Sequence, residues 1–223
     1  MIERNPDGGW RSSRLSELSW LLHCFGTALH SPEGEILLLK QVHSTAVHDA
    51  RGWAPAMEGD GLIAVEPGAK VGVKTADCVP ILLADRRRKA VAAVHAGWRG
   101  AAAGIAGAAA RRMAEVCGTD PADLIAAIGP SIGPCCFEVG PEVAQLFRPL
   151  FPQRRDLDRK TKIDLLEANV LQLEAAGVPK RQIDREGAPC TFCGGAEFHS
   201  WRRDRKEGLR MIAVIGIRQD WYI

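Results

Sequence analysis

Three possible metal ligands, His43, Cys78 and His95, each lie at or near the end of a short apolar run. They are far apart in the sequence, so only a folded sheet can bring them together. One thiolate and two imidazoles form a ligand set typical of zinc, with one ligand short of four. Because a structural zinc usually has four protein ligands, the set favours a catalytic zinc. Taken singly, such residues are more often buried core residues than ligands.

Short apolar runs separated by turn signals predict a β-sheet. Helical spacing, with Gly118 as a stop signal and Asp164 as a cap, predicts helices between the later strands. Because the two types interleave without strict alternation, we expect one mixed α/β (α+β) domain over residues 1–223 rather than a doubly wound sheet. We expect ordered packing to begin at Trp20, Leu21 and Leu22, with residues 1–20 poorly ordered. The predicted strands are 35–42, 62–65, 71–74, 79–84, 90–94, 124–128, one at Ile183, and 209–217, and the helices are 99–117, 141–150 and 164–176.

The composition is that of a globular protein, with 46% hydrophobic and 25% charged residues among 223. A net charge of +2 does not indicate a nucleic-acid partner, and no apolar run is long enough for a membrane span. With no apolar signal core at the N-terminus, we expect seven reduced cysteines in a cytoplasmic protein. The single C-x-x-C pair, Cys190 and Cys193, is a weak metal or redox signal. The oligomeric state, monomer or homodimer, is left open.

Two stretches place polar chemistry beside the possible ligands. In residues 74–80, Asp77 precedes Cys78, and a buried thiolate beside a carboxylate is unfavourable unless a cation is present. In residues 94–100, Arg99 begins a helix after His95, where backbone N–H groups attract anions. The alternatives are that Asp77 caps a turn beside a neutral thiol, and that Gly97 and Gly100 only permit close packing.

Two further stretches contribute candidate pocket residues. Residues 128–140 contain Cys135 and Cys136, which face opposite ways if they lie on a strand, so that Cys135 can line a pocket. Residues 190–204 contain Phe198, Trp201, Arg202 and Arg203, which can form a wall for stacking and anion binding.

Five motifs of the chain resemble, in the same order, those of the laccase-domain, or multicopper polyphenol oxidase, family. They are QVHS, KTADCVPILLAD, VHAGWRG, IGPSIGPCCFEVG and FHSWRRD. Members are also described as purine nucleoside phosphorylases with adenosine deaminase activity. The resemblance implies a four-layer α-β-β-α sandwich similar to the catalytic domain of the cytotoxic necrotizing factor toxins. It implies zinc on His43, Cys78 and His95. The implied substrates are adenosine, inosine, guanosine and 5′-methylthioadenosine, with phosphate as co-substrate.

From the residues and the resemblance together, we predict catalytic roles for Asp77, Cys78 and Arg99. Asp77 is the nearest candidate for a proton shuttle in deamination. We predict substrate contacts from Trp98, Arg99, Cys135 and Arg202. The chain departs from the family at Ala28, where an arginine is expected. If that arginine orients phosphate, the activity of this chain would be weaker, altered, or rescued by Arg99 or Arg202.

Three other readings remain open. A copper-dependent phenol oxidase is one, although six histidines are too few for a four-copper centre, and one thiolate with two imidazoles suits only an electron-transfer copper. A Cys-His hydrolase is another, with Cys78 as nucleophile and His95 or His43 as base. The third is a zinc-stabilised binding module without turnover, against which the open fourth position counts.

Overall fold

The computed structural model describes residues 1–87 and 89–219, which form two six-stranded β-sheets and a layer of helices. The first sheet has the order β1-β2-β3-β14-β7-β4, with strands Ile2–Arg4, Trp10–Ser12, Leu21–Phe25, Met211–Ile217, Lys70–Thr75 and Leu37–Leu38. The second has the order β13-β10-β8-β9-β6-β5, with strands Ile183–Asp184, Leu124–Ile128, Val79–Asp85, Ala90–Ala96, Gly61–Ala64 and Val47–Asp49. A separate two-stranded ribbon pairs β11 (Glu138–Val139) with β12 (Thr161–Lys162).

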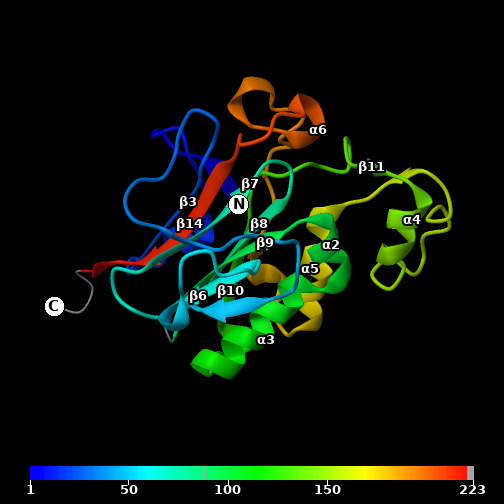
Figure 1. Cartoon of the computed structure of the whole chain (residues 1–223). Coiled ribbons are helices and arrows are strands. Elements are labelled where there is room, and N and C mark those ends of the chain that lie inside the picture. The colour runs from blue at the N-terminus through cyan, green and yellow to red at the C-terminus, as the bar shows by residue number, and fades with distance from the viewer. Residues whose placement is uncertain (88, 220–223) are drawn as a thin grey trace.

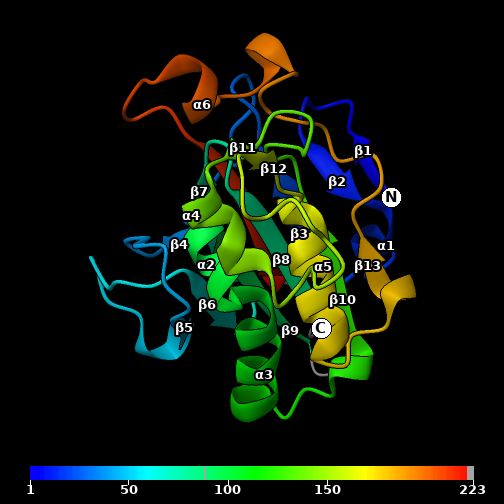
Figure 2. The ribbon, with the colours of Figure 1, turned by 90° about the vertical axis from the view of Figure 1, so that its right-hand side faces the viewer.

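The helices lie mainly on the second sheet. In Figure 1, α3 and α5 occupy one side of the molecule, and β3 and β14 the opposite side. Figure 2 looks onto this helix layer, with α3 and α5 in front of β8, β9 and β10. The six helices of the described residues are α1 (Ser13–Ser16), α2 (Trp98–Ala103), α3 (Ile105–Cys117), α4 (Pro141–Ala144), α5 (Leu165–Ala175) and α6 (Trp201–Asp204). None of them is both long enough and apolar enough to cross a membrane.

Burial of both faces explains why β8 is apolar without alternation. Ile81 and Leu83 belong to the core beneath the helices, whereas Leu82 and Ala84 belong to the core between the two sheets. A strand covered on both sides needs apolar residues at every position. The mixed α/β class is confirmed, with two packed sheets and helices. The similarity to the toxin catalytic domain stays a prediction.

The predicted helix over residues 99–117 is two helices. Gly104 separates them with φ 92°, a left-handed conformation that glycine adopts without a Cβ penalty. The side chain of Gln172 from α5 enters the break. It donates from Nε2 to the Ala101 carbonyl (2.6 Å) and accepts from the Ala106 amide (3.2 Å). A distant amide therefore satisfies the backbone groups that a continuous helix would pair internally.

The strand predicted over residues 35–42 is reduced to Leu37–Leu38. Beyond it, the Gln41 side chain pairs with the backbone of Lys74, donating to its carbonyl (2.8 Å) and accepting from its amide (2.7 Å). A side chain thus takes the place of the expected strand ladder and frees the chain to turn at His43. The other elements match within a few residues, although residues 141–150 form only α4 and a 3₁₀ turn at Gln145–Phe147.

The first twenty residues, expected to be poorly ordered, form β1, β2 and α1 in the structure. The side chain of Leu15 is fully buried, and Ile2 is nearly so. Asp184 of β13 accepts hydrogen bonds from Ser12 Oγ (2.6 Å) and the Arg14 amide (3.1 Å), which joins this segment to the second sheet.

Candidate metal and substrate site

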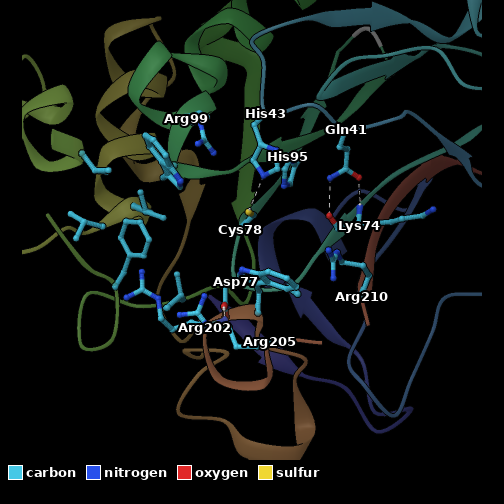
Figure 3. Close-up of a pocket in the computed structure, with 18 of the residues that line it drawn as sticks. Gln41, His43, Lys74, Asp77, Cys78, His95, Arg99, Arg202, Arg205 and Arg210 are labelled. Carbon is cyan, nitrogen blue, oxygen red and sulfur yellow. Dashed lines mark hydrogen bonds between the residues drawn. The ribbon is translucent and has the colours of Figure 1, made fainter. Parts of the chain in front are cut away.

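The structure brings together the three predicted ligands, whose donor atoms all lie within 4.8 Å of one another. Cys78 Sγ is 4.0 Å from His43 Nε2, and the two imidazole rings meet edge to face with centroids 4.9 Å apart. Figure 3 shows the three side chains pointing toward a common point. The three side chains are therefore brought together as the sequence predicted, and they form a group that could hold a metal ion.

Strand register explains how residues from three segments meet. β8 and β9 are antiparallel, with Val79 opposite Ala96 and Pro80 opposite His95. Cys78 precedes Val79, so it lies at the same sheet edge as His95. His43 reaches this edge from the loop after β4, with a left-handed φ of 61°. The arrangement needs both the hairpin and an unusual loop conformation.

Asp60, which was not among the predicted site residues, holds the loop at His43 and the strand β9 together. Its buried carboxylate lies 2.8 Å from His95 Nδ1 and accepts from the His43 amide (3.0 Å) and the Ser44 amide (2.6 Å). A carboxylate can only accept, so His95 carries its proton on Nδ1 and presents Nε2 toward Cys78. Such carboxylate–histidine pairs orient metal ligands in many proteins. The only sequence signal was an aspartate between two glycines at the start of a strand.

The site fits a soft divalent metal on two further counts. Gly97 faces it so closely that an added Cβ would lie 2.5 Å from His43 Cδ2 and 3.2 Å from Cys78 Sγ. The donor set itself is the nitrogen and sulfur combination that zinc prefers. The residues present therefore fit a metal held by His43, Cys78 and His95, with a side left for substrate.

The electrostatics favour a thiolate beside an imidazolium when no metal is bound. Burial raises the pKa of the Cys78 thiol, but the charge of His95 and hydrogen bonds from both histidines lower that pKa to about 6. Burial lowers the pKa of His95, but the Cys78 thiolate and Asp60 raise that pKa to about 9. For Asp60, burial also raises the pKa, and hydrogen bonds from His95 and Ser44 bring that pKa down to about 2. Thiolate is the form that binds metal and the form that acts as a nucleophile.

A pocket of about 1070 Å³ opens directly onto the three ligands. Its aromatic lining includes Trp98, Phe137 and Trp201. The Arg99 guanidinium carbon is 4.2 Å from the Trp98 ring centroid, and that of Arg202 is 5.4 Å from the Phe137 ring. Six basic residues also line the pocket: Lys40, Lys74, Arg99, Arg202, Arg205 and Arg210. Aromatic rings around one cavity suit a planar substrate, and the cations beside them suit an anion such as phosphate.

Asp77 lines the pocket but has its carboxylate occupied. With φ at 85°, it accepts from Thr191 Oγ1 (2.7 Å), Ser200 Oγ (3.0 Å) and the Arg202 amide (2.7 Å). These contacts make it an anchor for residues 191–202, as Figure 3 shows for Arg202. Its role as a proton shuttle stays a prediction.

Cys135, which was predicted to contact substrate, lies elsewhere. Among the described residues, those lining the pocket include neither Cys135 nor Ala28, the position where the family has an arginine. Cys135 Sγ is 3.7 Å from Cys193 Sγ, because the turn after Gly133 directs it toward the C-x-x-C segment. The amide of Ala28 donates to the Glu197 carbonyl (2.9 Å). Trp98, Arg99 and Arg202 line the pocket, and their contact with substrate stays a prediction.

Comparisons with known proteins agree with the resemblance read from the motifs. Residues 22–218 match the family described as multi-copper polyphenol oxidoreductase laccase. The chain is 42% identical over 189 residues to the purine nucleoside phosphorylase YlmD of Geobacillus stearothermophilus, covering 82% of this chain and 69% of that protein. It is 40% identical over 185 residues to the adenosine deaminase RL5 of an unknown prokaryotic organism, covering 76% and 70%. The crystal structure of YlmD from Geobacillus stearothermophilus superposes with a TM-score of 0.84 at 30% identity, covering 97% of this chain and 98% of that one.

Proposed function

The chain belongs to the multi-copper polyphenol oxidoreductase laccase family, and from that premise we propose that it is a zinc-dependent purine nucleoside phosphorylase with adenosine deaminase activity. The observation that supports this most is a three-ligand site, His43, Cys78 and His95, that faces a pocket lined by rings and cations. The relatives named for these two activities point the same way. The proposed substrates are adenosine, inosine, guanosine and 5′-methylthioadenosine, with phosphate.

A zinc ion held by three protein ligands would keep its fourth coordination position for water or substrate. Zinc held by His43, Cys78 and His95 would supply Lewis-acid polarisation and make water more acidic. Asp60 keeps His95 in the tautomer that leaves Nε2 available. The family description names copper, and the same donor set suits a single copper, but thiolate and imidazole with an open position favour zinc.

For phosphorolysis, the pocket residues bind and orient two partners. Trp98 and Phe137 offer faces on which a purine can stack. Arg99 and Arg202 offer guanidinium groups that match phosphate oxygens. A phosphate oxygen forms the bond to ribose C1′ as the bond from C1′ to the purine nitrogen breaks, and the leaving base takes up a proton. The basic lining would compensate for the arginine that Ala28 replaces.

For deamination, water adds at C6 of adenine and ammonia leaves. The reaction needs one group to accept and return a proton, and Asp77, which lines the pocket and adjoins Cys78 in the sequence, is the proposed candidate. Its three hydrogen-bond donors include two hydroxyls, from Thr191 and Ser200, which can relay a proton.

A Cys-His hydrolase is the second candidate, because Cys78 and His95 form a charged pair in the absence of metal. In that reading the Cys78 thiolate attacks a carbonyl carbon and His95 protonates the leaving group. Rapid alkylation of Cys78 in the protein as purified would favour this reading, because a metal-bound thiolate is protected.

The test is a product analysis with adenosine and zinc-loaded protein, with and without phosphate, resolved by liquid chromatography and mass spectrometry. We expect adenine and ribose 1-phosphate only when phosphate is present, and inosine in either condition. We expect His43→Ala to lose both products together with the ion bound at His43, Cys78 and His95, whereas Cys117→Ser, outside the residues that line the pocket, serves as the matched control. Full activity in a His43→Ala protein with no metal at this site would contradict the proposal, and unchanged adenosine would transfer support to the hydrolase.

A further inference from the structure

Four cysteines outside the substrate pocket form a second thiol cluster: Cys135, Cys136, Cys190 and Cys193. Their sulfur atoms all lie within 4.8 Å of one another. Cys193 Sγ is 3.3 Å from Cys136 Sγ and 3.7 Å from Cys135 Sγ. The cluster joins an adjacent pair to a C-x-x-C turn more than fifty positions later, and the proposed function uses none of its members.

The geometry is close to that of a tetrahedral thiolate site. A Zn–S bond of about 2.3 Å places neighbouring sulfurs roughly 3.8 Å apart, near the spacing observed here. The two supporting segments are already held together by the backbone. The Thr191 amide donates to the Ser131 carbonyl (3.0 Å), and the Gly194 amide closes the C-x-x-C turn on the Cys190 carbonyl (2.9 Å). An ion would therefore enter a preformed cage.

Backbone groups around the cluster also hold the cysteine side chains in position. The Gly133 amide donates to Cys190 Sγ (3.2 Å), a contact that orients a sulfur ligand and stabilises its charge. An added Cβ at Gly133 would lie 3.2 Å from Cys135 Sγ and 3.3 Å from Cys190 Cβ. Glycine at this position therefore allows the two cysteines to approach each other.

The cluster is unfavourable for four thiolates unless a cation is present. Four thiolates within 4.8 Å of one another would repel strongly, because like charges at this spacing are poorly screened in a partly buried cluster. A divalent ion would neutralise the negative charges of thiolates that otherwise repel one another.

We propose that Cys135, Cys136, Cys190 and Cys193 bind a structural zinc ion through four sulfur ligands, separate from the site at His43, Cys78 and His95. Four soft sulfurs at this spacing suit zinc or iron–sulfur chemistry, and a single closed site of this size suits one zinc ion. Each thiol releases its proton to solvent as its sulfur binds the ion, so no oxidant or reductant takes part. The closed set contrasts with the open three-ligand site.

The ion would fix one wall of the substrate pocket. Phe137 and Glu138, which follow Cys136 directly, line the pocket. Arg202, in the segment after Cys193, donates from Nη1 to the Glu138 carbonyl (2.8 Å). The cluster thus ties together the two segments that carry Phe137 and Arg202. Zinc in this cluster has a positioning role and no contact with substrate.

The test measures zinc per chain by plasma mass spectrometry on full-length protein purified anaerobically with reductant. The exposed Cys135 and Cys193 are replaced singly by serine, a change that leaves the core intact, with Cys117→Ser as the matched control. Each exchange is made in the wild-type chain and in a Cys78→Ser chain. We expect Cys78→Ser to retain one zinc ion, Cys78→Ser with Cys193→Ser or Cys135→Ser to retain none, and Cys117→Ser to lose none.

Zinc content that Cys135→Ser and Cys193→Ser leave unchanged would overturn the proposal. So would iron in the cluster, or a Cys136–Cys193 disulfide that persists through this purification and is found by peptide mapping after alkylation without further reduction. Failure of the proposed enzymatic function is a separate outcome, because zinc that persists in Cys78→Ser belongs to the four-cysteine cluster whether or not adenosine is consumed.

Discussion

At the residue scale, Asp60 and Gly97 decide whether the three candidate ligands can share one ion. Asp60 fixes the His95 ring and the backbone at His43, and Gly97 leaves the space that the His43 ring fills. Neither residue is one of the three ligands that would hold the ion. Both act through the position of those ligands, which is how many metal sites are tuned.

Gly97→Ala should weaken metal binding at His43, Cys78 and His95. Gly97 has an ordinary φ of −66°, so alanine introduces no backbone strain, and its Cβ would displace His43 instead. We expect metal affinity to fall on the order of 10- to 100-fold, the range seen when a group that orients ligands is lost. Competition with a chromophoric chelator measures it. Gly52→Ala, whose Cβ meets nothing within 4 Å, is the control, and equal affinity in both variants would refute the steric argument.

Cys78 in the metal-free protein should be alkylated with a pH midpoint near 6 rather than near its ordinary value of 9.0. The pKa of Cys78 is lowered by His95 and His43, so the thiolate persists above about pH 6 and is lost as the pH falls through that value. Peptide mapping after timed iodoacetamide treatment gives the rate at each pH. The buried Cys24, whose pKa is raised by burial to about 11, serves as an internal reference. A Cys78 midpoint near 9 would show that no such ion pair forms.

The grouping of the three candidate ligands was predictable from the sequence, whereas the residues that support them were not. His43, Cys78 and His95 are soft donors at the ends of apolar runs, and that combination is unusual in a core. Asp60 carries no such signal, because an aspartate before a strand is common and its partners come from distant segments. The direction of the Asp77 carboxylate was equally hidden, since Thr191 and Ser200 lie more than one hundred positions away.

At the scale of single elements, short sequence signals predict the helix ends that are fixed by contacts between residues close together in the chain. Gly118 ends α3 in a left-handed conformation, and Asp164 accepts from the Glu167 amide to begin α5. The predictions failed where a distant side chain replaces a backbone partner. Gln172 divides the helix over residues 99–117, and Gln41 replaces the strand ladder before His43. Neither effect has a periodic signature in the sequence.

Asp184→Asn should loosen the N-terminal elements. The buried carboxylate accepts from Ser12 Oγ and the Arg14 amide and pairs with the terminal amine of Met1 (3.0 Å). Because hydrogen bonds to a charged group contribute about 1.5–3 kcal/mol, we expect the free energy of unfolding to fall by about 2 kcal/mol. Hydrogen exchange should rise in residues 1–16, measured by mass spectrometry, with Asp158→Asn, at an exposed position outside this segment, as control.

The pH dependence of this loss follows from the sign of the shift. Burial raises the pKa of Asp184, but the hydrogen bonds from Ser12 and the terminal amine lower it below 3.8 overall. A lowered carboxyl pKa stabilises the folded state above the ordinary value, and this contribution disappears as the pH falls through the folded pKa. The difference between wild type and Asp184→Asn should therefore shrink below about pH 3.8. A difference that persists there would assign the effect to packing.

At the scale of the whole molecule, the site forms where the chain crosses from the first sheet to the second. The runs at 71–74 and 79–84 are consecutive, and the sequence predicts neighbouring strands, yet β7 belongs to the first sheet and β8 to the second. The turn between them contains Asp77 and Cys78. One residue then holds the segment 191–202 and the other meets the two histidines, so the crossing joins the metal site to the pocket wall. Apolar periodicity cannot predict which sheet a strand joins.

Zinc should stabilise the whole fold, because its three ligands come from segments that meet only in the folded chain. Urea unfolding of the Cys193→Ser chain, which lacks the proposed four-cysteine site, isolates this effect. With free zinc at about 100 times its dissociation constant, we expect a gain of about 2.7 kcal/mol in the free energy of unfolding. The gain should decline as the pH falls through about 6, since protons then compete for Cys78. Adding His43→Ala should remove most of it, and an equal gain without His43 would show that zinc stabilises the protein at some other place.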